Sequence, residues 1–184
     1  WKVPDSLRFV AVGGAPVSAD LLARAEGLGL PVFEGYGLSE CASVVCLNTP
    51  GAQRRGSVGR PLPHARVRVA GDGQIMVSGV TLQGYLGEPP RRPGEEWATG
   101  DLGEIDADGY VYVRGRIRNV FITSFGRNVA PEWVEREIVQ QPGVLHVMVH
   151  GEARPYAVAI VSAPRDSADD ATIDRAIAAA NAAL

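Results

Sequence analysis

The period of apolar and polar positions changes along this chain and predicts two kinds of structure in its first part. Residues 7–12 form an apolar, β-branched run. Apolar residues then recur on one face of a helix expected over 18–28, with Ser18 as its N-cap. A short strand is expected at 32–34. This strand–helix–strand order predicts parallel α/β pairing.

From about Gly56 the pattern becomes one of short alternating stretches separated by Gly, Pro and Asp. Asp108-Gly109 lies between two of these stretches and is typical of a β-hairpin. The pattern predicts antiparallel β-structure as a small barrel or a distorted sheet. It continues to a domain boundary near Arg118.

Beyond that boundary we expect a small α+β domain. Its elements are a hairpin over 119–129, a helix over 131–141 with Pro131 in the first turn, strands over 144–151 and 156–163, and a helix over 169–184. The predicted fold class is therefore α/β plus an antiparallel β-barrel or hairpins, followed by this small domain. The predicted domains are 1–117 (α/β over 1–55, β-rich over 56–117) and 118–184.

The charge, the apolar runs and the cysteine count of the sequence argue against several classes of function. The net charge of the 184 residues is −3, and no basic stripe carries aromatic residues, so we expect no nucleic-acid partner. No apolar run approaches membrane-spanning length and no signal-peptide pattern is present, which indicates a cytoplasmic protein. Cys41 and Cys46 have no matching His or second cysteine pair, so we interpret them as buried free thiols.

Asp101 and Arg116 are the first candidates for chemistry. A carboxylate can accept both hydroxyls of a ribose, and an Arg fork can hold ribose or phosphate oxygens. The pair predicts a nucleotide site at the end of a β-hairpin. The alternatives are a turn role for Asp101 in a Thr-Gly-Asp bend and a solvated strand-end cation for Arg116.

Five motifs in order resemble the adenylate-forming superfamily, which includes acyl-CoA synthetases, firefly luciferases and the adenylation domains of peptide synthetases. They are GGAPV (13–17), GYGLSE (35–40), GQIMVSG with a following GY (73–79, 84–85), WATGD (97–101) and GRIRNVFITSFGRNVAPEWVE (115–135). The resemblance covers nearly the whole chain. Its last motif is most similar to long-chain acyl-CoA synthetases.

The resemblance implies ATP-dependent activation of a carboxylic acid, fatty or otherwise apolar, to an acyl-adenylate. The acyl group then passes to a thiol such as coenzyme A. The implied cofactors are ATP or AMP, Mg²⁺ and coenzyme A, and the implied partners are the small-molecule acid and the nucleotide. Two alternatives stay open: a domain that loads a carrier protein, and a non-catalytic nucleotide-binding fragment.

The resemblance also implies roles for residues of the first two motifs. Tyr36 would stack on adenine, Ser39 would contact a phosphate oxygen, and Glu40 would be a metal ligand. The backbone turns that would lie along the nucleotide contain Gly13, Gly14, Ala15, Gly35 and Gly37. The structural alternatives are a core aromatic for Tyr36, an N-cap of the ASVVCL segment (42–47) for Ser39 and a surface or helix-start residue for Glu40. For Gly13, Gly14 and Ala15 the alternative is an ordinary strand-to-helix turn.

In the last motif Arg116 would lie near ribose or phosphate, and Arg118 would be the hinge on which the small domain turns. Gly126 would line the thiol tunnel, or would simply be a hairpin glycine with positive φ. Arg127 would contact the phosphate end of coenzyme A.

The superfamily's Gly- and Ser/Thr-rich phosphate loop and its C-terminal Lys have no match in this sequence, whose one Lys is Lys2. By this comparison we expect the chain to be the end of a large domain and the start of a small one. We expect it to be inactive alone and to be capable of self-association through exposed sheet edges.

Overall fold

The computed structural model describes residues 3–4, 6–15, 17, 19–164 and 170–183. It divides into two compact units, Trp1–Val113 and Arg114–Leu184. The boundary between the two units falls within one strand, Val111–Arg116. The domain boundary predicted near Arg118 stays a prediction.

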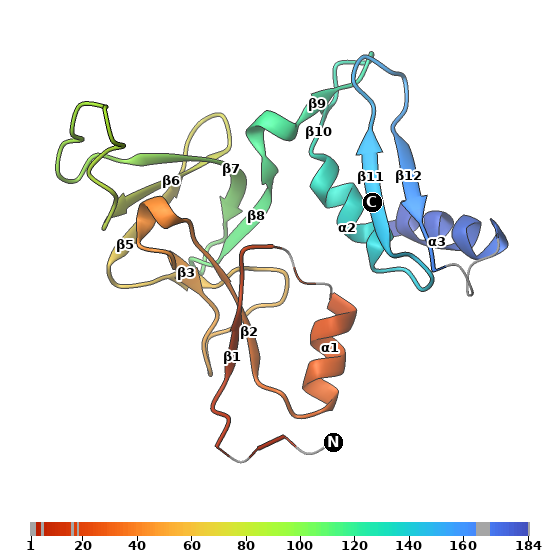
Figure 1. Cartoon of the computed structure of the whole chain (residues 1–184), viewed down its shortest axis with the longest axis horizontal. Helices are drawn as coiled ribbons and strands as arrows, with labels where there is room; N and C mark the ends of the chain where they lie inside the picture. The colour runs from red at the N-terminus through yellow and green to blue at the C-terminus, as the bar shows by residue number, and fades with distance from the viewer. Residues whose placement is uncertain (1–2, 5, 16, 18, 165–169, 184) are drawn as a thin grey trace. The chain divides into compact units, whose positions relative to one another are not determined.

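The first unit is built mainly of short strands (Figure 1). Its elements are β1 (Val10–Val12), α1 (Ala19–Gly27), β2 (Val32–Tyr36), the 3₁₀ helix η1 (Ser39–Cys41), β3 (Cys46–Leu47), β4 (Arg60–Pro61), β5 (Ala65–Val69), β6 (Gln74–Gly79), β7 (Trp97–Ile105) and β8 (Val111–Arg116).

The first sheet has the order β1-β2-β3-β4. β1 pairs with β2 in parallel, with Val10 opposite Val32, so the predicted parallel pairing across α1 is confirmed. β1 is shorter than the apolar run over 7–12 and begins only at Val10. Ser18, the predicted cap of α1, lies outside the described residues.

The second sheet has the linear order β5-β6-β7-β8. Its register shifts between Gln74 and Met76, which fits the distorted sheet of the two predicted forms. The predicted Asp-Gly hairpin is confirmed, since the Asp106 N–H donates to the Tyr110 carbonyl at 3.0 Å. Fully buried apolar side chains from both sheets form one core: Cys41, Val45, Cys46, Ile75, Val77 and Val111.

The second unit packs two helices against a two-stranded sheet. Its elements are the 3₁₀ helix η2 (Ile117–Asn119), β9 (Phe121–Ile122), β10 (Asn128–Val129), α2 (Pro131–Val139), β11 (His146–His150), β12 (Val158–Ser162) and α3 (Asp170–Ala183).

The predicted hairpin over 119–129, the two strands and the two helices of this unit are confirmed, with ends at or inside the expected ranges. Residues 169 and 184 of the last predicted helix lie outside the described residues. β9 pairs with β10, and β11 with β12, in antiparallel register. Pro131 lies in the first turn of α2, where a missing N–H costs nothing. The Val149 N–H donates to the Glu135 carboxylate at 2.8 Å, which fastens α2 to β11 over a core that includes Phe121 and Ile138.

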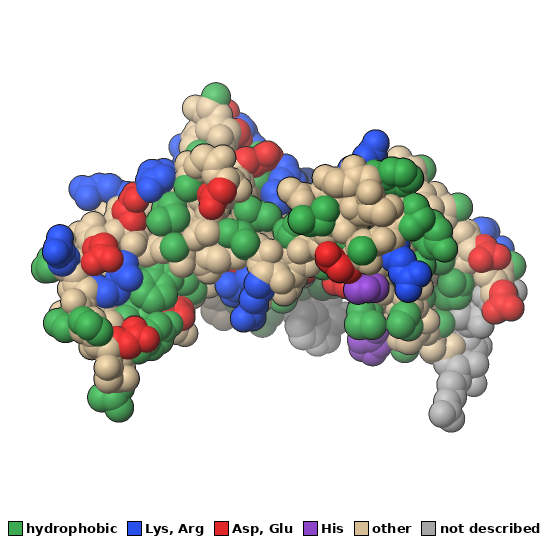
Figure 2. All heavy atoms as spheres, turned by 90° about the horizontal axis from the view of Figure 1, so that it is seen from above, with side chains coloured by type: hydrophobic (Ala, Val, Ile, Leu, Met, Phe, Trp, Pro, Cys, Tyr) green, Lys and Arg blue, Asp and Glu red, His purple; other side chains and the backbone are tan. Residues whose placement is uncertain are grey.

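Charged side chains of both signs are mixed on the surface (Figure 2), in line with the small net charge of −3. Figure 2 shows basic and acidic side chains intermingled on the visible face, without a continuous patch of one sign. Among the described helices, none combines the length and apolarity that crossing a bilayer requires.

Candidate nucleotide site

The GG turn after β1 lies beside the GYGLSE segment, which starts at the end of β2. A Cβ on Gly13 would lie 2.9 Å from the Gly35 carbonyl oxygen. A Cβ on Gly37 would lie 1.7 Å from the Ser43 carbonyl oxygen, which no side chain can accommodate. The GG turn therefore packs closely on β2 at Gly13, and the segment after η1 packs closely on Gly37. Gly14, with φ +82°, and Ala15 are exposed beside them.

Tyr36 and Asp101 are joined directly. The Tyr36 hydroxyl donates to Oδ2 of Asp101 at 2.5 Å, across 65 residues of sequence. The ring of Tyr36 packs against the core, as the structural alternative predicted. Its hydroxyl nevertheless reaches the second predicted nucleotide motif, so the two motifs form one cluster.

Asp101 is held in place by its own strand. It lies within β7 and is only 5% exposed. Gly100 has φ +77°, and the Thr99 hydroxyl accepts the Asp101 N–H at 3.0 Å while donating to the Ile75 carbonyl at 2.8 Å. The predicted Thr-Gly-Asp bend thus exists as an irregularity inside a strand. It orients the Asp101 carboxylate, whose oxygens can accept several hydrogen bonds.

Ser39 and Glu40 lie in η1. η1 ends at Cys41 and the next element is β3, so the ASVVCL segment (42–47) forms no helix, and the alternative of Ser39 as its N-cap is wrong. The reason is geometric: Ala42, with φ 57°, and Ser43, with φ 69°, have left-handed backbone that ends η1 after one turn, and the chain then enters β3. Ser39 is exposed, whereas Glu40 is half-buried and accepts a hydrogen bond from the Tyr85 hydroxyl at 2.8 Å.

Glu40 is compatible with a magnesium site of a particular kind. Within the described ranges, no group of three or more His, Cys, Asp or Glu side chains could enclose a metal ion. Mg²⁺ commonly binds through one or two carboxylates while keeping waters and substrate phosphates as its other ligands. A single half-buried carboxylate fits that donor set and does not fit a site made of protein ligands alone.

The remaining predicted residues belong to the second unit. Arg116 and Arg118 are exposed at the end of β8 and in η2. Gly126 has φ +75° in the β9–β10 turn, which confirms the hairpin-glycine conformation, and Arg127 is exposed next to it. Because Asp101 and Arg116 lie in different units, their joint hold on one ribose stays a prediction. So do the hinge, tunnel and coenzyme A roles.

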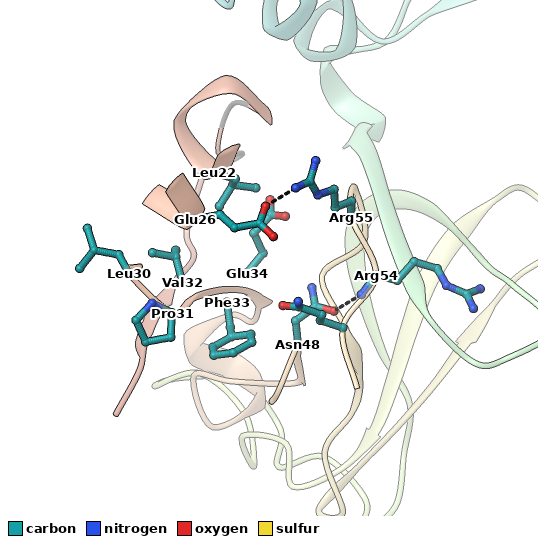
Figure 3. Close-up of a pocket in the computed structure, with 11 residues that line it drawn as sticks. Leu22, Glu26, Leu30, Pro31, Val32, Phe33, Glu34, Asn48, Arg54 and Arg55 are labelled. Carbon is teal, nitrogen blue, oxygen red and sulfur yellow. Dashed lines mark hydrogen bonds and ion pairs between the residues drawn. The ribbon is translucent and has the colours of Figure 1, made fainter. Parts of the chain in front are cut away.

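A pocket of about 240 Å³ lies elsewhere in the first unit, and none of the predicted site residues lines it (Figure 3). Side chains from α1, β2 and the segment 48–55 surround it. Glu26 and Arg55 form an ion pair at its rim, while the Arg54 guanidinium turns away from it. Arg54 instead binds Asp106 and Asp108 at 2.5 and 2.6 Å.

The two cysteine thiols are buried and stay protonated at neutral pH. Cys41 and Cys46 are free and fully buried, as the sequence predicts. Burial raises the pKa of Cys41 to about 11 and that of Cys46 to about 12. A thiolate nucleophile is therefore not part of this site at neutral pH.

Comparison with known proteins agrees with this motif order. The family model described as "AMP-binding enzyme" matches residues 2–101. This chain belongs to the AMP-binding enzyme family. The acyl-CoA ligases among its relatives and the solved adenylate-forming enzymes of similar structure place it in the adenylate-forming superfamily.

Three of these family members illustrate the similarity. The long-chain-fatty-acid–CoA ligase FadD15 of Mycobacterium bovis is 35% identical over 84% of this chain and 27% of its own length. Feruloyl-CoA synthase of an Amycolatopsis species is 35% identical over 95% of this chain and 39% of its own. The Bacillus subtilis O-succinylbenzoate coenzyme A synthetase, solved in complex with ATP and magnesium ion, has a TM-score of 0.79 and 27% identity over 94% of this chain and 40% of its own. This chain thus spans well under half the length of these relatives.

Proposed function

We infer that this chain supplies the adenosine and metal contacts of an AMP-forming acid–thiol ligase. The whole protein would convert a carboxylic acid and ATP to an acyl-adenylate and pyrophosphate, and would then transfer the acyl group to coenzyme A. The observation that carries this proposal is the hydrogen bond between Tyr36 and Asp101. It unites the two motifs that would hold the adenine and the ribose.

The chemistry needs charge and alignment more than a base. A carboxylic acid with a pKa near 4 is already ionised at neutral pH, so the obstacle is an anion approaching a polyanion. Mg²⁺, when bound, would neutralise part of the phosphate charge. The Glu40 carboxylate would hold it, and the exposed Ser39 hydroxyl would donate to a phosphate oxygen.

Other residues would bind and orient the nucleotide. The Gly13–Ala15 turn and the backbone at Gly35 and Gly37 would lie along the adenine, with the Tyr36 ring stacked on it. Asp101 would accept a ribose hydroxyl. Fixing the nucleotide in this way converts a two-body encounter into a reaction between positioned groups.

The second unit would complete the cycle. Arg116 would meet the ribose or phosphate, and Arg118 would be the hinge of a small domain over 118–184. Gly126 and Arg127 would approach coenzyme A. Support for coenzyme A over a carrier protein comes from the names of the three relatives, each of which is a coenzyme A ligase or synthetase.

We further propose that the acid is apolar. The segment CASVVCL after Glu40 has no charged side chain, and Cys41, Val45 and Cys46 are fully buried in the core. One 35%-identical relative is named for a long-chain fatty acid and another for feruloyl-CoA, so both aliphatic and aromatic apolar acids fit the proposal. We also propose that this chain alone is inactive and self-associates.

The test uses the intact protein that carries this region. Acid-dependent exchange of pyrophosphate into ATP is measured with fatty, aromatic and short polar acids, followed by thioester formation with coenzyme A. We expect exchange with an apolar acid, and its loss in the Asp101→Ala variant. Absence of exchange with every acid, from a folded protein that binds ATP, would reject the ligase. This 184-residue chain should show no exchange, but should bind AMP weakly in calorimetry.

A further inference from the structure

The long loop between β6 and β7 carries a tyrosine that reaches back to η1, forty-five residues earlier. The Tyr85 hydroxyl donates to Oε1 of Glu40 at 2.8 Å. The backbone of the loop also contacts Glu40, because the Leu82 N–H donates to the Glu40 carbonyl at 2.7 Å. Glu40 is therefore held from this loop at both its side chain and its backbone.

The ring of Tyr85 is itself braced. It meets the Trp97 ring edge-on, with centroids 6.0 Å apart. On Trp97 lies the Arg91 guanidinium, 4.8 Å from the ring centroid. The Arg91 guanidinium in turn donates a hydrogen bond to the Glu96 carbonyl at 2.7 Å and forms an ion pair with the Glu95 carboxylate at 3.1 Å.

The backbone of the loop brings these groups together. The Arg91 N–H donates to the Gln83 carbonyl at 2.7 Å, which closes the loop on itself around Gly84. Gly84 has φ +134°, a conformation that side chains rarely adopt, and it directly precedes Tyr85. The Tyr85 side chain is thereby turned toward Glu40, and half of its surface faces solvent.

We propose that Tyr85 is a positioning residue for Glu40: its hydroxyl selects one orientation of the carboxylate so that the other oxygen faces the metal of the nucleotide complex. This proposal rests on the proposed function above. A carboxylate on a freely rotating side chain presents its oxygens in many directions. A hydrogen bond from a braced phenol removes most of them before the metal arrives, as outer partners of metal ligands do elsewhere.

The Tyr85→Phe variant isolates the hydroxyl, because the phenyl ring can keep its place against Trp97. The matched control is Tyr112→Phe, which removes another tyrosine–carboxylate hydrogen bond of the same unit, from Tyr112 to Asp106 at 3.0 Å. Both variants are made in the intact protein. Mn²⁺ serves as the spectroscopic probe. With the protein in excess over Mn²⁺ and ATP, electron paramagnetic resonance distinguishes Mn²⁺ in the protein–ATP complex from Mn²⁺ bound to ATP alone in solution.

We expect Tyr85→Phe to weaken Mn²⁺ binding by about tenfold, the lower end of the range for outer partners of metal ligands. In pyrophosphate exchange, the apparent KM for Mg²⁺ should rise by a similar factor, while the rate at saturating Mg²⁺ should change much less. The Tyr112→Phe variant should match the wild type in both measurements.

A second measurement needs no nucleotide. In protein labelled at the tyrosine ¹³Cζ, the Tyr85 resonance is assigned with Tyr85→Phe. Glu40→Gln should move this resonance and leave that of Tyr112 in place. An unmoved resonance would mean that the two side chains do not meet, and it would overturn the proposal even if the ligase activity is present.

The outcomes separate the two proposals. Wild-type Mn²⁺ binding with unchanged affinity in Tyr85→Phe would overturn the positioning role alone. A wild type that holds no Mn²⁺ in the presence of ATP would overturn the proposed function, and the positioning role with it.

Discussion

The Tyr36 hydroxyl is hydrogen-bonded to the Asp101 carboxylate at 2.5 Å, although the two residues lie in different sheets and are 65 positions apart. Tyr36 ends β2 and Asp101 lies in the middle of β7. The contact fastens the first sheet to the second at the place where both predicted nucleotide motifs meet. It should therefore matter for stability as well as for binding.

Replacement of Tyr36 by Phe should destabilise the folded chain by about 1.5–3 kcal/mol, the usual worth of a hydrogen bond to a charged group. The loss arises because Asp101 stays buried without this donor. Chemical denaturation of the variant and the wild type measures the difference. The control is Tyr156→Phe, at a side chain that is 65% exposed, where we expect a change within about 0.5 kcal/mol. Equal stability of Tyr36→Phe and wild type would show that the bond contributes nothing.

Replacement of Gly37 by Ala should be among the most damaging small changes in the first unit. The new methyl group would lie 1.7 Å from the Ser43 carbonyl oxygen, and only a backbone shift can relieve that contact. We expect a loss of about 3 kcal/mol or more in the free energy of unfolding, because overpacking against main chain cannot relax through a rotamer.

Gly71→Ala is the matched control for Gly37→Ala, since a Cβ at Gly71 meets nothing within 4 Å. It should be neutral, or stabilising by up to about 1 kcal/mol through the unfolded chain. Similar losses in both variants would point to a general sensitivity to glycine replacement and would contradict the steric explanation.

The buried thiols predict a stability that falls at high pH. Their pKa values in the folded chain, about 11 for Cys41 and about 12 for Cys46, lie above the ordinary value of 9.0. A raised pKa favours the protonated thiol in the folded state, so the contribution is complete below pH 9.0 and is lost as the pH rises toward 12. Denaturation at increasing pH measures this loss.

The same burial should block thiol reagents. At about pH 8, a disulfide reagent such as dithionitrobenzoate should label neither cysteine in the folded chain and both after unfolding in guanidinium. Cys41→Ser should reduce the unfolded count to one and identify the thiol that remains. Rapid labelling of the native chain would contradict the burial of both side chains.

The β7–β8 hairpin should make stability sensitive to acid. Burial raises the pKa of Asp106, but hydrogen bonds from the Tyr110 N–H, Arg54 and Tyr112 outweigh it and hold the pKa below 3.8. A lowered pKa favours the carboxylate in the folded state. Its contribution is therefore present above pH 3.8 and is lost as the pH falls through the folded value.

Asp106→Asn should remove this part of the acid dependence and should lower stability at neutral pH, because the Arg54 ion pair goes with it. Denaturation between neutral pH and about pH 2 tests both effects. Asp174→Asn, at an exposed position on α3, controls for the simple loss of a negative charge. An acid profile of Asp106→Asn that parallels the wild type would assign the dependence to other groups.

Local signals in the sequence were sufficient for most of the elements. Pro131 marks the start of α2, Asp108-Gly109 marks the β7–β8 hairpin, and the apolar period predicts α1 between two strands. These features depend on backbone preferences and on periods of a few residues, which are written in the sequence itself. The order of the motifs was enough to indicate the superfamily.

Contacts between distant segments could be decided only by the tertiary structure. Tyr36 on Asp101 and Tyr85 on Glu40 span 65 and 45 residues, and each depends on how a whole loop or strand is routed. The end of η1 before Ala42, which leaves the ASVVCL segment without a helix for Ser39 to cap, likewise lies next to the close packing of Gly37 against Ser43. Local propensity contains no information about that packing, because the steric contact arises only when both segments are already in place.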